Sequence, residues 1–154
     1  TVLDPEINKN LLSELNPNVV LVGLNFSEDV NHKPFENFHA GGKFTDFKTR
    51  YALRDSPYWG GYMTDIIKNH PEKKSDELVK YLKTHPDEVQ SNVESFRQEL
   101  RDIGAEKPTL IAFGIPAHTI LKRNLSEFEI RKITHYAHRI NKEKYREEVK
   151  QSVP

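Results

Sequence analysis

The sequence predicts an α/β protein of the three-layer α/β/α type, built on a four-stranded, mainly parallel sheet. Short apolar runs rich in β-branched residues alternate with longer segments whose apolar residues recur every three or four positions. Each apolar run is continuous, which is typical of strands buried on both faces of a parallel sheet. The length of 154 residues fits a single domain, 1–154, and we find no repeat or interdomain linker.

The first half of the chain predicts two helices and two strands. Asp4 is suited to cap a helix over residues 5–15, because a proline follows it at the first helical position. The run 19–22 predicts the first strand, and the run 62–67 predicts the second. Aromatic residues spaced through 44–51 predict a short helix between them.

The second half continues the alternation of helices and strands. Its predicted elements are a helix capped by Ser75, a helix that begins at Pro86 and stops at Gly104, a strand over 109–114, a helix from Pro116, a weaker strand over 128–134, and a helix capped by Asn141. Strands that alternate with helices imply a parallel sheet with helices on both faces.

Composition excludes several classes of chemistry. The chain has no cysteine, which removes disulfides, thiolate zinc sites, iron–sulfur clusters and a cysteine nucleophile. No apolar run approaches the roughly 18–20 residues that span a bilayer, and residues 1–10 lack an apolar signal core. We therefore expect a cytoplasmic protein without a membrane partner, and we predict no cofactor.

The net charge is zero, but the charges are unevenly spread. Residues 131–150 hold seven basic and three acidic side chains, a net charge of +4, whereas residues 72–106 hold nine acidic and six basic ones, a net charge of −3. One face could therefore bind phosphates while another stays in water. An ordinary solvated helix explains each segment equally simply.

Polar residues follow the predicted strands at the sheet edge where open α/β folds bind ligands. Asn25 either orients a water molecule or caps the next helix, and capping is the commoner role. Asp65 lies inside an apolar strand, so its carboxylate needs a partner such as Lys68, a backbone N–H or a ligand. His135 is placed to stabilise a developing oxyanion.

Other chemistries receive little support from the sequence. His135 and His138 have the spacing of a metal pair, but no third ligand stands at a telling distance, so we predict no metal. Phe35 and Phe38 lie in a polar loop, where they either stack on a base or cover the core. Phosphate-binding glycine loops and the nucleophile elbow of α/β-hydrolases are missing.

Taken together, four segments resemble the motifs of the uracil-DNA glycosylase superfamily, in the same order along the chain. They are Val20–Ser27 for the family's first strand and turn, Phe38 for the base-stacking phenylalanine, Tyr62–Lys68 for the strand that reads the base, and His135–Asn141 for the last motif. The strand 110–114 with Ala117 and Leu121 matches the family's next strand and helix. The resemblance covers residues 18–141 and implies a divergent member.

The resemblance implies a DNA glycosylase that flips a base out of the duplex and hydrolyses its N-glycosidic bond. Asn25 would position the attacking water and His135 would hydrogen-bond the base oxygen. By the same analogy the remaining residues divide into two groups: Gly23, Leu24, Phe26, Phe38 and Asp65 would bind the base, and Ser27, His138, Arg139 and Lys142 would bind DNA, with Arg139 wedged into the gap left by the flipped base.

Three departures from the family pattern bear on specificity. Phe26 replaces the usual proline, and Tyr136-Ala137 replaces Pro-Ser. Asp65 stands where uracil readers have asparagine, and an ionised carboxylate only accepts hydrogen bonds. The sequence therefore argues against ordinary uracil specificity, unless Asp65 is protonated. A cytosine-like amine, or a purine N1–H beside an amine, would suit a group that only accepts.

The residues leave open whether the chain is an enzyme. A non-catalytic module that binds a nucleobase or nucleic acid on the same fold is the main alternative. A third reading is an unrelated hydrolase that uses Asp65 and His135 on a flavodoxin-like sheet. The sequence does not determine the oligomeric state.

Overall fold

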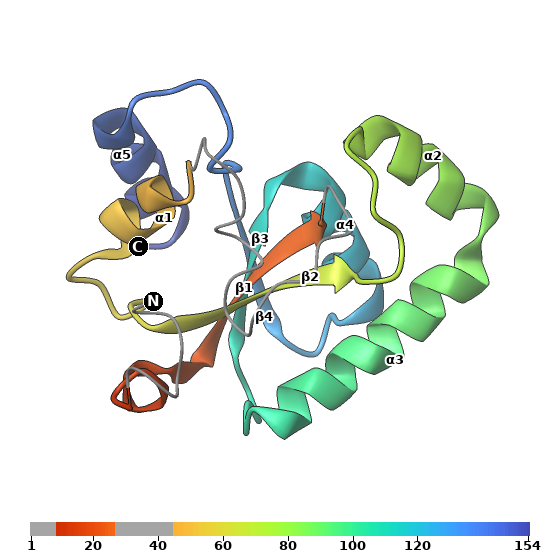
Figure 1. The fold of residues 1–154 in the computed structure, drawn as a ribbon, viewed down its shortest axis with the longest axis horizontal. Coiled ribbons are helices and arrows are strands. Elements are labelled where there is room, and N and C mark those ends of the chain that lie inside the picture. The colour runs from red at the N-terminus through yellow and green to blue at the C-terminus, as the bar shows by residue number, and fades with distance from the viewer. Residues whose placement is uncertain (1–8, 27–44) are drawn as a thin grey trace.

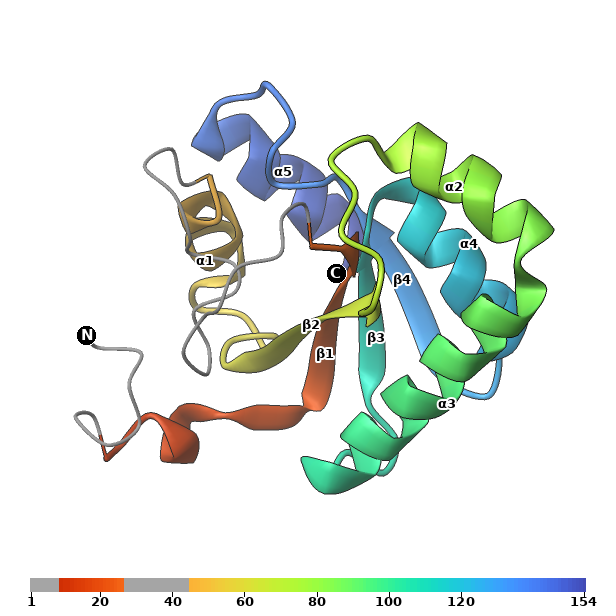
Figure 2. The ribbon, with the colours of Figure 1, turned by 45° about the vertical axis from the view of Figure 1, so that its right-hand side comes forward.

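The computed structural model describes residues 9–26 and 45–154 and shows an α/β fold in three layers (Figures 1 and 2). One sheet has the strand order β2-β1-β3-β4, and every neighbouring pair is parallel. The strands are β1 (Asn16–Asn25), β2 (Gly61–Ile67), β3 (Thr109–Phe113) and β4 (Glu129–Ile133). The fold class predicted from the sequence is therefore confirmed.

Helices cover both faces of this sheet. Helices α1 (Phe47–Leu53) and α5 (Lys142–Ser152) pack together on one face, and α3 (Pro86–Asp102) and α4 (Gly114–Asn124) cover the other (Figure 2). Helix α2 (Ser75–Thr84) lies beside α3. The carboxyl ends of the four parallel strands consequently meet at one edge, with helices on either side of it.

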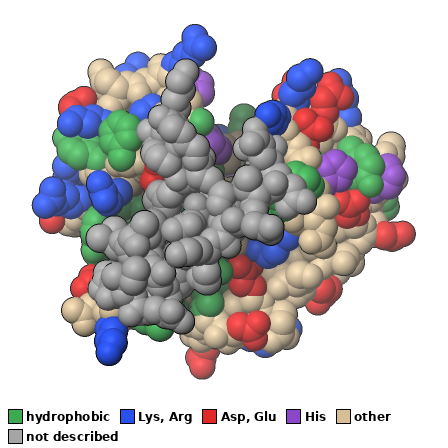
Figure 3. Space-filling view, in the orientation of Figure 1, with side chains coloured by type: hydrophobic (Ala, Val, Ile, Leu, Met, Phe, Trp, Pro, Cys, Tyr) green, Lys and Arg blue, Asp and Glu red, His purple; other side chains and the backbone are tan. Residues whose placement is uncertain are grey.

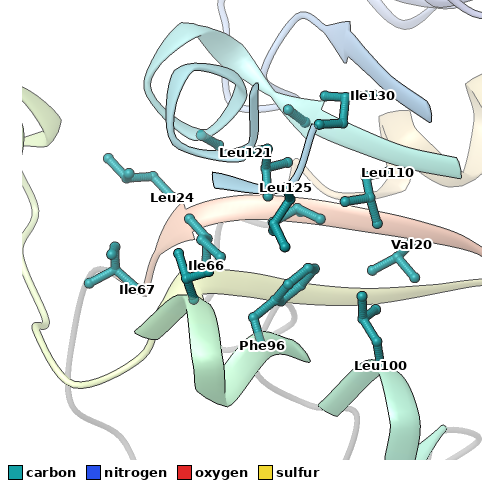
Figure 4. Packing of buried hydrophobic residues seen from close by; sticks show 14 of the residues in the cluster. Val20, Leu24, Ile66, Ile67, Phe96, Leu100, Leu110, Leu121, Leu125 and Ile130 are labelled. Atoms are coloured by element: carbon teal, nitrogen blue, oxygen red, sulfur yellow. The ribbon is translucent and has the colours of Figure 1, made fainter. Parts of the chain in front are cut away.

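The alternation of side chains along β1 divides the core into two halves. Val20, Val22 and Leu24 point toward α3 and α4, where they pack with Phe96 and Leu121 (Figure 4). Both Phe96 and Leu121 have no exposed surface. Burying a side chain of this size stabilises the fold by about 1.5–3 kcal/mol, so this half of the core is a major source of stability.

The second half of the core lies beneath α1 and α5. Val19 and Leu21 point to this side and meet Phe113 of β3. Tyr145 of α5 is fully buried there, and its hydroxyl donates to the Thr134 carbonyl oxygen at 2.9 Å. Burial raises the pKa of Tyr145 to about 12, so the hydroxyl remains a donor at neutral pH.

The amino end of the chain differs from the predicted helix over 5–15. Within the described part, only a single 3-10 turn forms (Leu12–Glu14), and β1 begins directly after it at Asn16. The Asn16 backbone N–H donates to the Gly60 carbonyl oxygen at 2.8 Å. A Cβ at Gly60 would lie 2.1 Å from the Glu14 carbonyl oxygen, and Gly60 has a φ of +77°. Pairing with the residue before β2 therefore extends the strand beyond the predicted run 19–22.

The predicted helix ends are mostly confirmed. Gly104 follows α3 with a φ of +73°, a conformation that favours glycine. The side chain of Asn141 accepts a hydrogen bond from the Lys144 backbone N–H at 2.8 Å, as expected of an N-cap. Ser75 is the first residue of α2, and Lys74 occupies the cap position that the sequence assigned to Ser75.

Residues 9–26 and 45–154 contain no helix long and apolar enough to cross a lipid bilayer.

Candidate functional site

A row of residues crosses the sheet near the carboxyl ends of the strands. Gly23 of β1 pairs with Asp65 of β2, and Phe113 of β3 pairs with Ile133 of β4. Val22 of β1 pairs with Ala112 of β3, so the same register continued by one residue brings Phe113 beside Gly23. In-register parallel neighbours share a face, so these side chains all face the layer of α1 and α5. Gly23 lies in this row between Asp65 and Phe113, and as a glycine it leaves a gap between the carboxylate and the phenyl ring.

The Asp65 carboxyl group lies over this glycine. A Cβ at Gly23 would be 2.1 Å from Asp65 Oδ1, so the carboxylate fits only because Gly23 has no side chain. Asp65 is 8 % exposed, and among the described residues its carboxylate has no hydrogen-bond donor or cation within contact. Burial raises its pKa to about 6, and the charge of Lys68 opposes this shift. Asp65 is therefore a buried carboxylate that is mostly ionised at pH 7.

Lys68 does not form the ion pair with Asp65 that the sequence offered as one partner. Its Nζ lies 2.8 Å from Glu99 Oε2 and donates to Thr64 Oγ1 at 2.7 Å. It also donates to the Asp65 backbone carbonyl oxygen at 2.9 Å. Thr64 points to the α3 face because neighbouring residues of a strand alternate in direction. The Lys68 side chain lies on the same face as Thr64, whereas the Asp65 carboxylate lies on the opposite face.

Aromatic rings gather beside this row, where β4 ends. The rings of Phe113 and Tyr136 are nearly perpendicular, with centroids 5.1 Å apart, and His135 stacks on Tyr136 at 4.4 Å. The negative charge of Asp65 contributes, after burial, to raising the pKa of the Tyr136 hydroxyl. This electrostatic effect indicates that the carboxylate and the phenol share one poorly solvated region.

His135 is held as a neutral imidazole with a defined tautomer. The Ala137 backbone N–H donates to His135 Nδ1 at 3.1 Å. A nitrogen that accepts this bond carries no proton, so Nε2 carries the proton of the neutral ring. Burial, followed by the nearby His138, lowers the pKa of His135 below its ordinary value. The ring therefore offers an Nε2–H donor without a positive charge at neutral pH.

Asn25, predicted as a catalytic residue, forms hydrogen bonds to the loop that follows β2. Its Nδ2 donates to the carbonyl oxygens of Phe26 at 2.9 Å, and of His70 and Glu72 at 3.0 Å each. Three acceptors around one nitrogen fix the orientation of the amide. Among the described residues no donor reaches Asn25 Oδ1. This oxygen is therefore the one atom of the side chain that could orient a water molecule.

The other predicted base-binding residues divide between the two sides of the sheet. Leu24 is 8 % exposed and packs in the core beneath α3 and α4, so only its main chain is available to a ligand. Phe26 is half-buried at the end of β1, and its carbonyl oxygen bonds to Asn25. Phe38 and Ser27 lie outside the described residues.

A hydrogen bond from α1 holds the loop after β4. Lys48 is 8 % exposed, and its Nζ donates to the His138 carbonyl oxygen at 2.9 Å. At the far end of the loop, Asn141 caps α5, and Thr134 donates to Glu148 Oε2 at 2.9 Å. These contacts fix the main chain that carries His135.

The predicted DNA-binding residues of this loop are exposed. His138 and Arg139 lie on the loop itself, and Lys142 begins α5. Lys142 Nζ and the Arg146 guanidinium each lie 5.1 Å from the centre of the Tyr51 ring. These two cation–π contacts hold two positive charges on the outer side of α1 and α5.

The surface is hollowed between the side that carries α1 and α5 and the side that carries α2, with histidine and hydrophobic atoms at the bottom (Figure 3). Across residues 9–26 and 45–154, no group of three or more His, Asp or Glu side chains is placed to hold a metal ion. His135 and His138 therefore have no third side chain in the described structure with which to bind a metal ion.

Sequence reasoning did not assign three residues of this region. Phe113 was expected only as part of a buried strand, Tyr136 only as a departure from a family motif, and Lys48 was not singled out. The spacing of Lys48 on a short helix gives no hint of its burial, because its acceptor lies 90 positions away. Tyr136 carried a usable signal, since a tyrosine directly after a strand-end histidine can stack on it.

Comparison of the chain with protein-family models, with curated proteins and with solved structures finds no match.

Proposed function

We propose that this chain binds a nucleobase at the carboxyl edge of its sheet and hydrolyses the N-glycosidic bond of a base flipped from DNA, as a divergent relative of the uracil-DNA glycosylases. The observation that carries this proposal is the state of His135. A neutral imidazole with its proton on Nε2 donates to a base oxygen as negative charge develops there. It does so without first having to lose a proton.

The surroundings of His135 suit a planar ligand. Tyr136, packed edge-on against the buried Phe113, supplies aromatic surface, and Asp65 supplies a buried polar group for the edge of a base. Aromatic faces and a few fixed polar groups are the usual composition of a site for a flipped base. Asn25 Oδ1 orients the attacking water, because the Nδ2 atom is fixed by loop carbonyl oxygens.

Phosphate contacts come from the loop after β4 and from α5. Arg139 fills the gap in the duplex, and His138 and Lys142 contact the backbone, with Arg146 adding a second charge beside Tyr51. The basic segment 131–150 supplies the local positive charge that the chain as a whole lacks.

The test is release of free base from duplexes that each carry one damaged or mispaired base, followed by chromatography. His135→Ala should lower the rate of release by at least about 100-fold, since loss of one oxyanion donor has this effect in other enzymes. His85→Ala is the matched control, because His85 is an exposed histidine beyond α2 that stacks on Tyr81. Release that is unaffected by His135→Ala would contradict the proposal.

A second function, binding without catalysis, is favoured by one observation. The amide nitrogen of Asn25 is fully committed to the loop after β2, as expected of a structural residue. Such a module would bind DNA or free base, with an affinity that falls with salt, and would leave every glycosidic bond intact. The third reading from the sequence finds no support in geometry, because no hydrogen bond joins Asp65 and His135 in the described structure. Asp65 lies on one outer strand, β2, and His135 follows the other outer strand, β4.

A further inference from the structure

Asp65 is a buried carboxylate without a described partner, in a chain that has a lysine close by. Lys68 Nζ contacts Glu99, Thr64 and the Asp65 backbone carbonyl oxygen, all at 2.9 Å or less. Burying an ionised carboxylate without hydrogen-bond donors costs free energy, and proteins normally provide such donors. Since Lys68 is bound on the other face of the sheet, a donor from a ligand would complete this site.

The position of the carboxylate limits the kind of ligand. Asp65 Oδ1 occupies the space above Gly23, so the carboxylate reaches over β1 toward Phe113. Two strand spacings separate β2 from β3, which places the Cα atoms of Asp65 and Phe113 about 10 Å apart. Among the described residues, the rings of His135 and Tyr136 pack against Phe113 at these strand ends, and Phe113 itself is 2 % exposed. A carboxylate beside aromatic rings suits a flat ring with polar edges.

Resting on the proposed function, we infer that Asp65 selects bases whose edge carries two adjacent N–H donors, a ring N–H beside an amino group as in guanine, and rejects the uracil edge. An ionised carboxylate accepts two parallel N–H bonds, the arrangement that makes charge-assisted pairs strong. Uracil presents a carbonyl oxygen beside its ring N–H, and that oxygen would face the negative charge of Asp65.

The state of the carboxyl at neutral pH agrees with this assignment. A pKa of about 6 leaves the group mainly ionised at pH 7. The charged groups that act on its pKa are Lys68, which directly follows β2, and Glu99 on α3. Tyr136 after β4 is affected by both Asp65 and Asp46, and His135 stacks on Tyr136. None of the residues described on these elements gives the carboxylate a donor in place of the ligand.

The experiment compares two ligands of the same size. Isocytosine has a ring N–H beside an amino group, and uracil has a ring N–H beside a carbonyl oxygen. Binding of each to the wild-type protein and to Asp65→Asn is measured at pH 7 by calorimetry. Wild type should bind isocytosine at least about tenfold more tightly than uracil, which corresponds to about 1.4 kcal/mol, because only isocytosine gives the carboxylate two donors. Asp65→Asn should reverse the order, because asparagine both accepts from a ring N–H and donates to a carbonyl oxygen.

Two controls sharpen the result. Asp102→Asn removes an exposed carboxylate at the end of α3 and should leave the preference unchanged. Methylguanidine offers two parallel donors without a heterocycle, and binding as tight as that of isocytosine would overturn the assignment to a base in favour of an arginine side chain.

The outcomes separate the inference from the proposed function. Equal binding of uracil and isocytosine by wild type, or an unchanged preference in Asp65→Asn, would refute the role of Asp65 while leaving base release to be judged by its own assay. Release of uracil from DNA in preference to guanine-type bases would likewise refute this inference and support the proposed function. Absence of both binding and release would overturn both.

Discussion

The Oδ1 atom of Asp65 lies 2.1 Å from the point where a Cβ on Gly23 would stand. The carboxylate and the glycine are partners in adjacent parallel strands, and the position of one depends on the other. A side chain at Gly23 would have to displace a carboxyl group that is 8 % exposed and has little room to move.

Gly23→Ala is therefore expected to displace the Asp65 carboxyl and to destabilise the protein by about 1–3 kcal/mol, the usual cost of overpacking. It should also abolish the preference between isocytosine and uracil. Gly61→Ala is the matched control, because a Cβ there would be 2.8 Å from a methyl group of Val19 at the other end of the strands. Urea denaturation and calorimetry measure the two effects, and a Gly23→Ala protein that keeps the wild-type preference would place the ligand elsewhere.

Asp65→Asn should stabilise the protein at neutral pH. A carboxyl whose pKa rises from 3.8 in the unfolded chain to about 6 in the fold binds more protons when folded, so the free energy of unfolding decreases as pH rises through this interval. The loss amounts to about 3 kcal/mol at pH 7 and to less than about 1 kcal/mol at pH 4. Asparagine keeps the shape and removes the charge.

The measurement for Asp65→Asn is the difference in free energy of unfolding between variant and wild type, from urea denaturation at pH 4 and at pH 7. The difference should favour the variant and grow with pH. A variant that is less stable than wild type at pH 7 would mean that the carboxylate has donors which asparagine cannot use.

Lys48→Met should loosen the loop that carries His135. Methionine retains most of the apolar length of lysine but cannot donate to the His138 carbonyl oxygen. We expect a loss of stability of about 1 kcal/mol and a several-fold decrease in the rate of base release. Lys48→Arg should restore part of both. Lys150→Met, which removes an exposed lysine of α5, is the control, and equal effects of the two methionine variants would reduce the role of Lys48 to its charge.

Lys142→Gln should weaken DNA binding and lower its dependence on salt. Each lost phosphate contact reduces the slope of log affinity against log salt concentration by about 0.9 for duplex DNA. Lys107→Gln, before the amino end of β3, serves as the control for charge alone. Fluorescence anisotropy at several salt concentrations gives the slopes, and identical slopes for Lys142→Gln and Lys107→Gln would remove α5 from the interface.

Much of the fold could be read from local patterns. The continuous apolar run 109–113 could only be a buried strand once helical segments flanked it, and the apolar spacing of α3 with its terminal Gly104 defined a helix and its end. Such signals act over a few residues, through side-chain period and backbone conformation. The predicted helix over 5–15 was wrong over its described part, 9–15, because pairing with Gly60 draws Asn16 into β1 and leaves a 3-10 turn before it.

The sequence by itself determined the α/β class, the parallel sheet, and the position of Asp65 and His135 near the carboxyl ends of their strands. The order of polar and apolar residues along the chain encodes these features locally. Only the tertiary structure decided that Lys68 bonds to Glu99 rather than to the Asp65 carboxylate, that Asn25 holds the loop after β2, and that Phe113 and Tyr136 surround His135. Those contacts join residues far apart in the chain, and their existence depends on which face of a strand each side chain takes and on the space that a glycine leaves beside it.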